Sequence, residues 1–287
     1  MCRFAAYIGD PIVLDELLYR PRNSLILQSY KAKEREEPLN GDGFGVGWYD
    51  REFDPTPAVF RSVTPAWSNL NLQSIAKKTL SGCFFAHIRA ATHNSPVLEV
   101  NCHPFSFGRF LWMHNGHIGG FPLLKRRIVN LLSEELYLSI RGSTDTEHAF
   151  ALFLNHIHSP ESGASPFEMK VALLGMVEIL QKLATDNNIE ETSYLNICVT
   201  NGDELIALRY VSDPAKPPHS LYCSQEGRYV IDVEGVSQLV DTVSSEMGII
   251  VSSEKLTPGE KDWNQIPPIH LVMIDKNLSV NVEKVGR

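Results

Sequence analysis

Short apolar runs separated by turn-rich segments recur over much of the chain. This pattern predicts strands at residues 3–9, 44–49, 58–63 and 109–114, and a closing strand at 269–274. Residues 83–91 are almost all apolar, which is typical of a strand buried on both faces. The dipeptide Asn201-Gly202 separates two further apolar runs, and its residues readily adopt positive φ angles, so it predicts a tight hairpin turn.

A helical period of apolar residues occurs in fewer places. We expect helices at 12–19, at 68–79 with Ser68 as its cap, at 122–132, at 144–157 and at 167–185. The helix at 144–157 begins with Thr144 and Glu147, which fit a capping box. Many short strands with two long helices on one face favour an α+β fold, and the chain is expected to form a single domain over residues 1–287.

The charge balance excludes some classes of partner. The 26 Lys and Arg residues face 34 Asp and Glu residues, for a net charge of −8. A general binder of nucleic acid or of anionic membranes would need a cationic face, so neither partner is expected. There is no run of 18 apolar residues and no signal-peptide pattern, and the five cysteines contain no CxxC pair. We therefore expect a reduced protein located in the cytoplasm.

Cys2 is the first residue with candidate chemistry. The initiator Met1 is normally removed when the second residue is small, which would leave Cys2 with a free α-amino group. An α-amine titrates near pH 7.7–8.0, so it could act as the base for the thiol of its own residue. This mechanism requires that Met1 be absent, and the alternative is that a cysteine at position 2 has no function.

Arg89 is the second candidate, because it lies in the apolar run that starts at residue 83. A buried guanidinium is costly unless an anion pairs with it. That anion could be a carboxylate of the protein, in a structural salt bridge. It could also be the carboxylate of a substrate, held by two parallel hydrogen bonds.

Asn115, Gly116 and Asp145 complete the set of candidates. Asn115-Gly116 ends a predicted strand and is either an ordinary turn or an oxyanion hole made of the Asn115 side-chain amide and the Gly116 backbone N–H. Asp145 is in the first turn of a predicted helix, where a carboxylate favours the helix dipole. If it faces inward, it could instead pair with a substrate ammonium.

Two other features do not support a cofactor. The glycines of residues 40–47 alternate, lack the GK[ST] of a P-loop and are not spaced as GxGxxG, so they indicate a bulged strand with close backbone approach and not a nucleotide site. The histidines between 87 and 117 include His93 but form no HExxH motif. A metal-dependent hydrolase stays an open alternative with no ligand set, and we expect neither metal nor cofactor.

In this order and spacing, five segments resemble those of the class II (N-terminal nucleophile) glutamine amidotransferase family. They are MCRF at 1–4, NGDGFGVGWY at 40–49, HIRAAT at 87–92, HNG at 114–116 and STDTE at 143–147. At the level of the fold, the resemblance extends to SSEKL at 252–256. It implies an αββα four-layer sandwich of two packed sheets flanked by helices.

The resemblance also implies a role for each candidate residue. Cys2 is the expected nucleophile, Arg89 the holder of the glutamine α-carboxylate and Asp145 the partner of its α-ammonium. Asn115 and Gly116 are the expected oxyanion donors. Many biosynthetic members carry Arg-Gly-x-Asp where this chain has Asn-Gly-Asp-Gly at 40–43, and standalone members usually have Trp in place of Phe44. We interpret both points as favouring the standalone branch, with the role of this loop left open.

The length of the chain bears on the reaction. A class II glutaminase domain needs on the order of 200–250 residues, so this chain has little room for a second domain that accepts ammonia. The expected function is hydrolysis of a γ-glutamyl amide, with glutamine as the default substrate. Two alternatives stay open: a glutaminase that delivers ammonia to a separate synthase or works with a peptidase subunit, and a silent binding or regulatory module.

Overall fold

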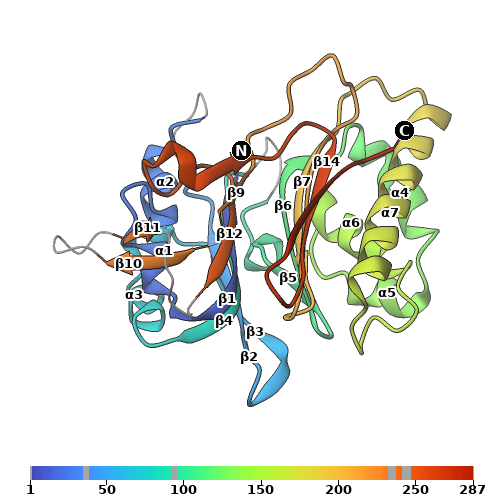
Figure 1. The fold of residues 1–287 in the computed structure, drawn as a ribbon. Helices are drawn as coiled ribbons and strands as arrows, with labels where there is room; N and C mark the ends of the chain where they lie inside the picture. Colours follow the sequence, from blue (N-terminus) through green and yellow to red (C-terminus); the bar gives the residue numbers. More distant parts are fainter. Residues whose placement is uncertain are drawn as a thin grey trace.

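Two antiparallel β-sheets pack face to face, and helices cover the outer face of each sheet (Figure 1). The structure is a computed structural model that describes residues 2–34, 39–91, 96–225, 227–231, 237–240 and 247–286. The order of layers is helix, sheet, sheet, helix, so the predicted αββα sandwich of α+β class is confirmed.

The first sheet has seven strands in the order β13-β9-β12-β1-β4-β2-β3. Its strands are β1 (Arg3–Val13), β2 (Phe44–Asp50), β3 (Asp54–Ser62), β4 (Leu80–Ile88), β9 (Tyr222–Ser224), β12 (Gly248–Ser252) and β13 (Trp263–Gln265). Three short helices cover its outer face: α1 (Asp15–Leu18), α2 (Leu25–Lys31) and α3 (Leu70–Ala76).

The second sheet has six strands in the order β15-β14-β8-β7-β6-β5. They are β5 (Phe105–Phe107), β6 (Phe110–His117), β7 (Tyr194–Thr200), β8 (Leu205–Val211), β14 (His270–Ile274) and β15 (Val280–Lys284). Its outer face carries α4 (Phe121–Val129), α5 (Glu134–Ser139), α6 (Asp145–Leu154) and α7 (Pro166–Asp186). A separate hairpin joins β10 (Arg228–Ile231) to β11 (Ser237–Val240), and 3₁₀ turns span Ala66–Ser68, Glu99–Asn101 and Glu260–Asp262.

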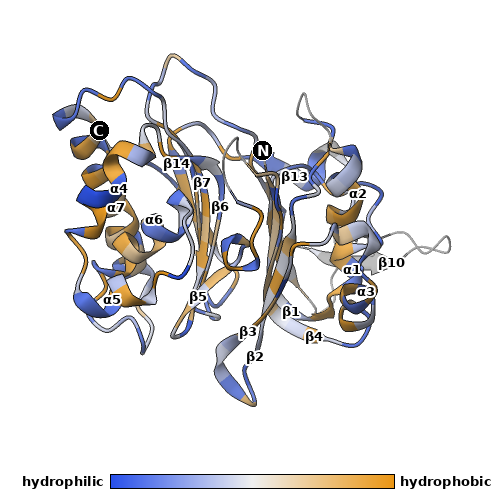
Figure 2. Ribbon diagram, turned by 180° about the vertical axis from the view of Figure 1, so that it is seen from behind, coloured by the Kyte–Doolittle hydropathy of each residue, from blue (hydrophilic) through white to orange (hydrophobic). Residues whose placement is uncertain are grey.

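The buried strands of the sandwich send alternate side chains to two different apolar layers. In β1, Phe4 and Ala6 lie in the layer between the sheets, whereas Ala5 and Tyr7 pack under the helices of the outer face. This follows from the two-residue period of a strand. Figure 2 shows the result, with apolar residues gathered on the strands and on the helices that pack against them.

The glycines of β2 allow a neighbouring segment to lie against the strand. A Cβ atom on Gly45 would come within 2.2 Å of the backbone oxygen of His103. The predicted close backbone approach is therefore confirmed. The predicted bulge lies after the glycines and not among them. The register of β2 with β3 shifts between Trp48 and Asp50.

Several predicted helix boundaries were wrong. The expected helix at 12–19 is a single turn, α1, because Ile12 and Val13 still pair with β4 as part of β1. Helix α3 is shorter than predicted, and Asn69 replaces Ser68 as its cap, with its side-chain oxygen 2.8 Å from the backbone nitrogen of Leu72.

The hairpin of β7 and β8 exists, but its turn differs from the prediction. Thr200 pairs with Leu205, so four residues form the loop. Gly202 has a φ of +95°, whereas Asn201 accepts hydrogen bonds from the backbone N–H groups of Asp203 and Glu204 through its side chain. An Asx turn thus takes the place of two positive φ angles.

The chain also continues past the predicted closing strand into β15, which pairs with β14 at the edge of the second sheet. Most of its residues are exposed, so it lacks the buried face that marks a strand in sequence. Across the described ranges, each helix falls short of the length and apolar character needed to span a bilayer.

Candidate active site

Cys2 lies at the start of β1, at one end of the first sheet. Its Sγ is 3.6 Å from the backbone oxygen of Ala90, which follows β4, because β1 and β4 pair with Arg3 opposite Ile88. Cys2 precedes Phe4 by two residues, and Phe4 faces the space between the sheets. The Cys2 side chain, which is half-buried, therefore belongs to the same side.

Arg89 follows β4 and remains in the pairing of the sheet. Its backbone N–H donates to Gly43 over 2.8 Å, and its carbonyl accepts from the Asp42 N–H over 3.1 Å. The side chain of Asp42 in turn accepts from the Ala91 N–H over 2.8 Å. The loop at 40–43 thus holds the main chain around Arg89. The sequence analysis left the role of this loop open.

Asn115 lies on β6 and faces the first sheet. Leu111 and Met113, four and two residues earlier, both belong to the layer between the sheets. The Asn115 side chain is fully buried, and neither of its polar atoms has a hydrogen-bond partner among the residues described. A buried amide without partners is uncommon, and it leaves both a donor and an acceptor for a bound molecule.

Gly116 follows with a φ of +152°, and a Cβ atom there would lie 1.8 Å from the backbone oxygen of Tyr194. Only glycine fits this close approach of β6 to β7. The prediction of a turn at Asn115-Gly116 was wrong, because both residues still pair within the sheet, opposite Asn196 and Leu195.

Asp145 begins α6 directly beside the end of β6. Its carboxylate accepts from the Ile118 N–H over 2.8 Å and from the Thr146 N–H over 2.8 Å. Thr144 caps the helix as predicted, by accepting from the Glu147 N–H over 3.3 Å. The Glu147 carboxylate does not close a capping box, because it accepts from the N–H groups of Arg141 and Gly142.

The segment after residue 96 connects Arg89 to the turn before Asp145. Arg89 donates through Nη2 to the backbone oxygen of Pro96 over 3.2 Å, and Asn101 donates to the same oxygen over 3.1 Å. The Asn101 side chain also accepts from the Ser143 N–H over 2.9 Å. The structure therefore brings the neighbourhoods of all five predicted site residues to one end of the sandwich.

Two buried histidines join the sheets at this end. His87 of β4 lies with Nε2 3.3 Å from the backbone oxygen of His114 on β6, and its ring centroid is 4.0 Å from that of His103. Burial lowers the pKa of His87 to about 3 and also lowers the pKa of His103 and His114. Within the described ranges, no three His, Cys, Asp or Glu side chains gather as metal ligands, and His93 lies outside those ranges.

Two other cysteines of the chain are poor nucleophiles. Cys102 is fully buried, and burial raises its pKa to about 11. Burial likewise raises the pKa of Cys83 to about 11. Both thiols stay protonated at neutral pH, whereas a nucleophile must form a thiolate.

Two residues that the sequence analysis overlooked lie behind Cys2. Arg3 and Glu254 form an ion pair of 2.8 Å, with exposures of only 2% and 1%. The rule applied to Arg89, that a buried guanidinium demands an anion, applies equally to Arg3 within the apolar opening strand. It could have identified Arg3, although not its partner.

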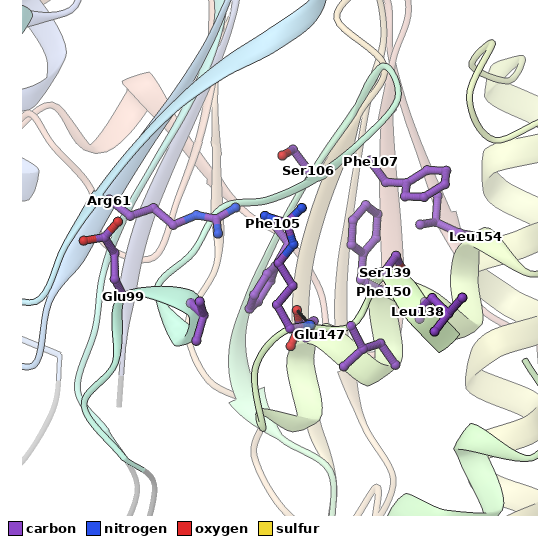
Figure 3. A pocket seen from close by; sticks show the side chains of 14 residues that line it. Arg61, Glu99, Phe105, Ser106, Phe107, Leu138, Ser139, Glu147, Phe150 and Leu154 are labelled. Carbon is purple, nitrogen blue, oxygen red and sulfur yellow. Dashed lines mark hydrogen bonds between the residues drawn. The ribbon is translucent and has the colours of Figure 1, made fainter. Parts of the chain in front are cut away.

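A cavity of about 440 Å³ lies next to this region, and Figure 3 shows the side chains that line it. Arg61 reaches into it from β3, Phe105 comes from β5 and Glu147 from α6. The Arg61 guanidinium lies 5.5 Å from the centre of the Phe105 ring. None of the five predicted site residues lines this cavity, so the predicted site and the cavity are separate features.

Comparison with known proteins agrees with this geometry. A family described as class II glutamine amidotransferases matches residues 22–285. A protein of Saccharomyces cerevisiae named probable glutamine amidotransferase DUG3 is 36% identical over 96% of this chain and 82% of its own length. The γ-glutamyl-hercynylcysteine sulfoxide hydrolase of Mycolicibacterium smegmatis is 36% identical over 43% of this chain, and the match spans about half of that hydrolase.

Solved structures show the same fold. A glutamine aminotransferase class-II domain protein from Silicibacter pomeroyi superposes with a TM-score of 0.66 at 27% identity, over the full length of both chains. A glutamine phosphoribosylpyrophosphate amidotransferase from B. subtilis gives 0.62 at 14% identity, with 99% of this chain covering 49% of that one. The predicted resemblance is confirmed: the chain belongs to the class II glutamine amidotransferase family and is an amidohydrolase of that type.

Proposed function

We propose that this protein hydrolyses a γ-glutamyl amide through a thioester on Cys2. The observation that carries the proposal is the location of Cys2, Arg89 and Asn115 on facing strands at one end of the sandwich, with Asp145 beside them. A nucleophile, a cation, an amide donor and a carboxylate are the groups that binding and cleaving a glutamyl substrate requires.

The reaction begins once Met1 has been removed; Met1 itself lies outside the described residues. The α-amine of Cys2 takes the proton of its own thiol, and the thiolate attacks the γ-carbonyl carbon of the substrate. The C–N bond breaks, and the α-ammonium returns the proton to the departing ammonia or amine. Water then attacks the thioester, with the α-amine again as base, and releases glutamate and the free thiol.

Four residues bind the substrate around this chemistry. Arg89 pairs with the α-carboxylate, because its planar guanidinium matches a carboxylate with two parallel hydrogen bonds. Asp145 pairs with the α-ammonium. The Asn115 side-chain amide and the Gly116 N–H stabilise the negative charge that develops on the oxygen of the substrate amide. This role would supply a partner for the Asn115 side chain, which has none among the described residues.

We propose glutamine as the default substrate, with conjugates that carry a larger amine as alternatives. The named activity of the Mycolicibacterium smegmatis relative, hydrolysis of a γ-glutamyl-hercynylcysteine sulfoxide, supports a γ-glutamyl bond as the shared chemistry. Arg89 and Asp145 would recognise only the glutamyl end, so the amine end decides between these substrates.

The test is an assay of glutamate release from a panel of γ-glutamyl amides, on protein whose N-terminus has been determined by mass spectrometry. Cys2→Ala should abolish release while the protein stays folded. Cys102→Ala is the matched control, since it removes a nearby buried thiol and should retain activity. If Cys102→Ala abolishes release and Cys2→Ala does not, the proposed nucleophile is wrong.

A further inference from the structure

The buried ion pair behind Cys2 contacts the nucleophile's own main chain. Arg3 donates from Nε to Glu254 over 2.8 Å, from Nη1 to the Cys2 carbonyl over 3.0 Å and from Nη2 to the Glu34 carbonyl over 2.9 Å. All three nitrogens of the guanidinium are therefore engaged. One of them fixes the carbonyl of the residue that carries the thiol.

Glu254 holds the other side of this arrangement. Its carboxylate accepts from the Lys33 N–H over 3.1 Å, from the Glu34 N–H over 3.0 Å and from the Asn23 side chain over 3.2 Å. Burial raises the pKa of Glu254, but the Glu34 N–H and the charge of Arg3 outweigh it, so the net pKa is lowered. Glu254 is therefore an anion at neutral pH.

The pair is also anchored in the sheet on the side of Glu254. Phe4, two residues after Cys2, donates its N–H to the Ser253 hydroxyl over 3.1 Å and accepts from the Ser253 N–H over 3.0 Å. A closed ring of contacts thus runs from Cys2 through Arg3 and Glu254 back to β1. This ring restricts the start of β1, where a chain terminus would otherwise fray.

A buried ion pair is weak evidence for stability, because the cost of removing both charges from water offsets most of their attraction. The position of this pair suggests another use. We propose that Arg3 and Glu254 are positioning residues for Cys2, which orient its thiol and its α-amine toward the substrate. This inference rests on the proposed function.

The proposal predicts an effect on pH dependence that a purely structural pair would not produce. Glu254→Gln leaves the charge of Arg3 uncompensated next to the Cys2 α-amine. A nearby positive charge disfavours the ammonium form, so the pKa of this amine should fall. The acid limb of kcat/KM should then move to lower pH. The charged and titratable groups around this N-terminus are Arg3, Glu34, Arg89, Cys102, His219 and Glu254.

The experiment compares three variants with the wild-type enzyme, each checked for Met1 removal and melting temperature. Glu254→Gln should lower kcat/KM at least tenfold, alter the rate at which iodoacetamide alkylates Cys2 and shift the acid limb. Arg3→Gln/Glu254→Gln, which removes both charges, should lower kcat/KM without that shift. Asp15→Asn is the matched control, since it breaks a 2.6 Å ion pair with Arg20 at α1 and should leave turnover unchanged.

Folded, processed Glu254→Gln protein with wild-type turnover, alkylation and pH profile would overturn the proposal. If this variant does not fold, the double variant decides, and wild-type turnover in it has the same consequence. Failure of the proposed function gives a different result. In that case the wild-type enzyme releases no glutamate, or Cys2→Ala keeps its activity.

Discussion

The two sheets contribute to the candidate site in different ways. At the end of the first sheet, Arg3 binds Glu254 across 251 positions of the chain, and Cys2 contacts Ala90 across 88. At the end of the second sheet, Asp145 binds the Ile118 N–H across only 27 positions. The contacts that hold Cys2 and Arg3 thus join far more distant segments than the contact that holds Asp145.

This difference separates two kinds of function within one site. On the second sheet, Asn115 carries an amide with no partner in the described part of the chain, and we propose it as an oxyanion donor. On the first sheet lie the proposed nucleophile Cys2, the pair Arg3–Glu254 behind it and the proposed carboxylate binder Arg89. Loss of Asn115 should therefore act on the transition state, whereas loss of Arg89 should act mainly on substrate binding.

The largest effect among the remaining predictions is expected at Asn115. As the thiolate attacks, the amide oxygen gains a negative charge that the bound substrate lacks, so loss of one donor should lower kcat and leave KM nearly unchanged. Asn115→Ala should reduce kcat by about 10²–10³, or roughly 2.7–4 kcal/mol. Asn115→Asp should be slower still, because a carboxylate repels the oxyanion.

Melting temperature, measured on the same preparations, separates this role from a structural one. The Asn115 side chain has no hydrogen bond to lose within the described residues, so Asn115→Ala should cost little stability beyond a small cavity. A variant with lower stability but full turnover per folded molecule would remove Asn115 from the oxyanion hole.

The sequence was most informative where structure is local. The strand predicted at 83–91 exists as β4 at Leu80–Ile88, and this strand, the cap at Thr144 and the approach to the glycines of β2 follow from periodicity, capping and side-chain size. These features depend on residues within a few positions, or on the absence of a side chain. The candidate site residues could be proposed because they lie in short motifs.

The sequence was least informative where contacts are distant. Burial shows that Arg3 needs an anion, and SSEKL at 252–256 contains Glu254, but no sequence pattern indicates that these two residues pair. In the same way, β15 is a strand because β14 offers it an edge, and its own exposed side chains carry no signal. The cavity beside Arg61 arises from elements of both sheets and has no sequence pattern at all.

A smaller effect is expected at Arg89, on the first sheet. Arg89→Lys keeps the charge but loses the planar fork that matches a carboxylate, so substrate binding should weaken. We expect KM to rise about tenfold, equivalent to about 1.4 kcal/mol, with a smaller change in kcat. Steady-state kinetics with glutamine would measure both. Unchanged kinetics in a folded variant would exclude Arg89 from the substrate site.

The smallest effect concerns His87, through which the two ends contact each other. Burial lowers the pKa of His87 to about 3, whereas an unfolded histidine titrates near 6.5. Between these values the unfolded chain binds a proton that the folded chain does not. The contribution of His87 to stability is therefore complete above about pH 6.5 and is lost as the pH falls toward 3, by up to about 1.4 kcal/mol for each pH unit.

His87→Gln removes the group that titrates. The free energy of unfolding should then fall less steeply below pH 6.5, and the slope should differ by the amount that corresponds to about one bound proton. The substitution also alters the contact with the His114 backbone oxygen, which would lower stability by a similar amount at every pH. The change in slope isolates the proton from the contact, so the free energy of unfolding should be measured by denaturant titration at pH 7 and pH 5. Equal slopes in the two proteins would mean that His87 binds its proton equally well in the folded and unfolded chains. Burial between the sheets would then not disfavour the charged imidazole.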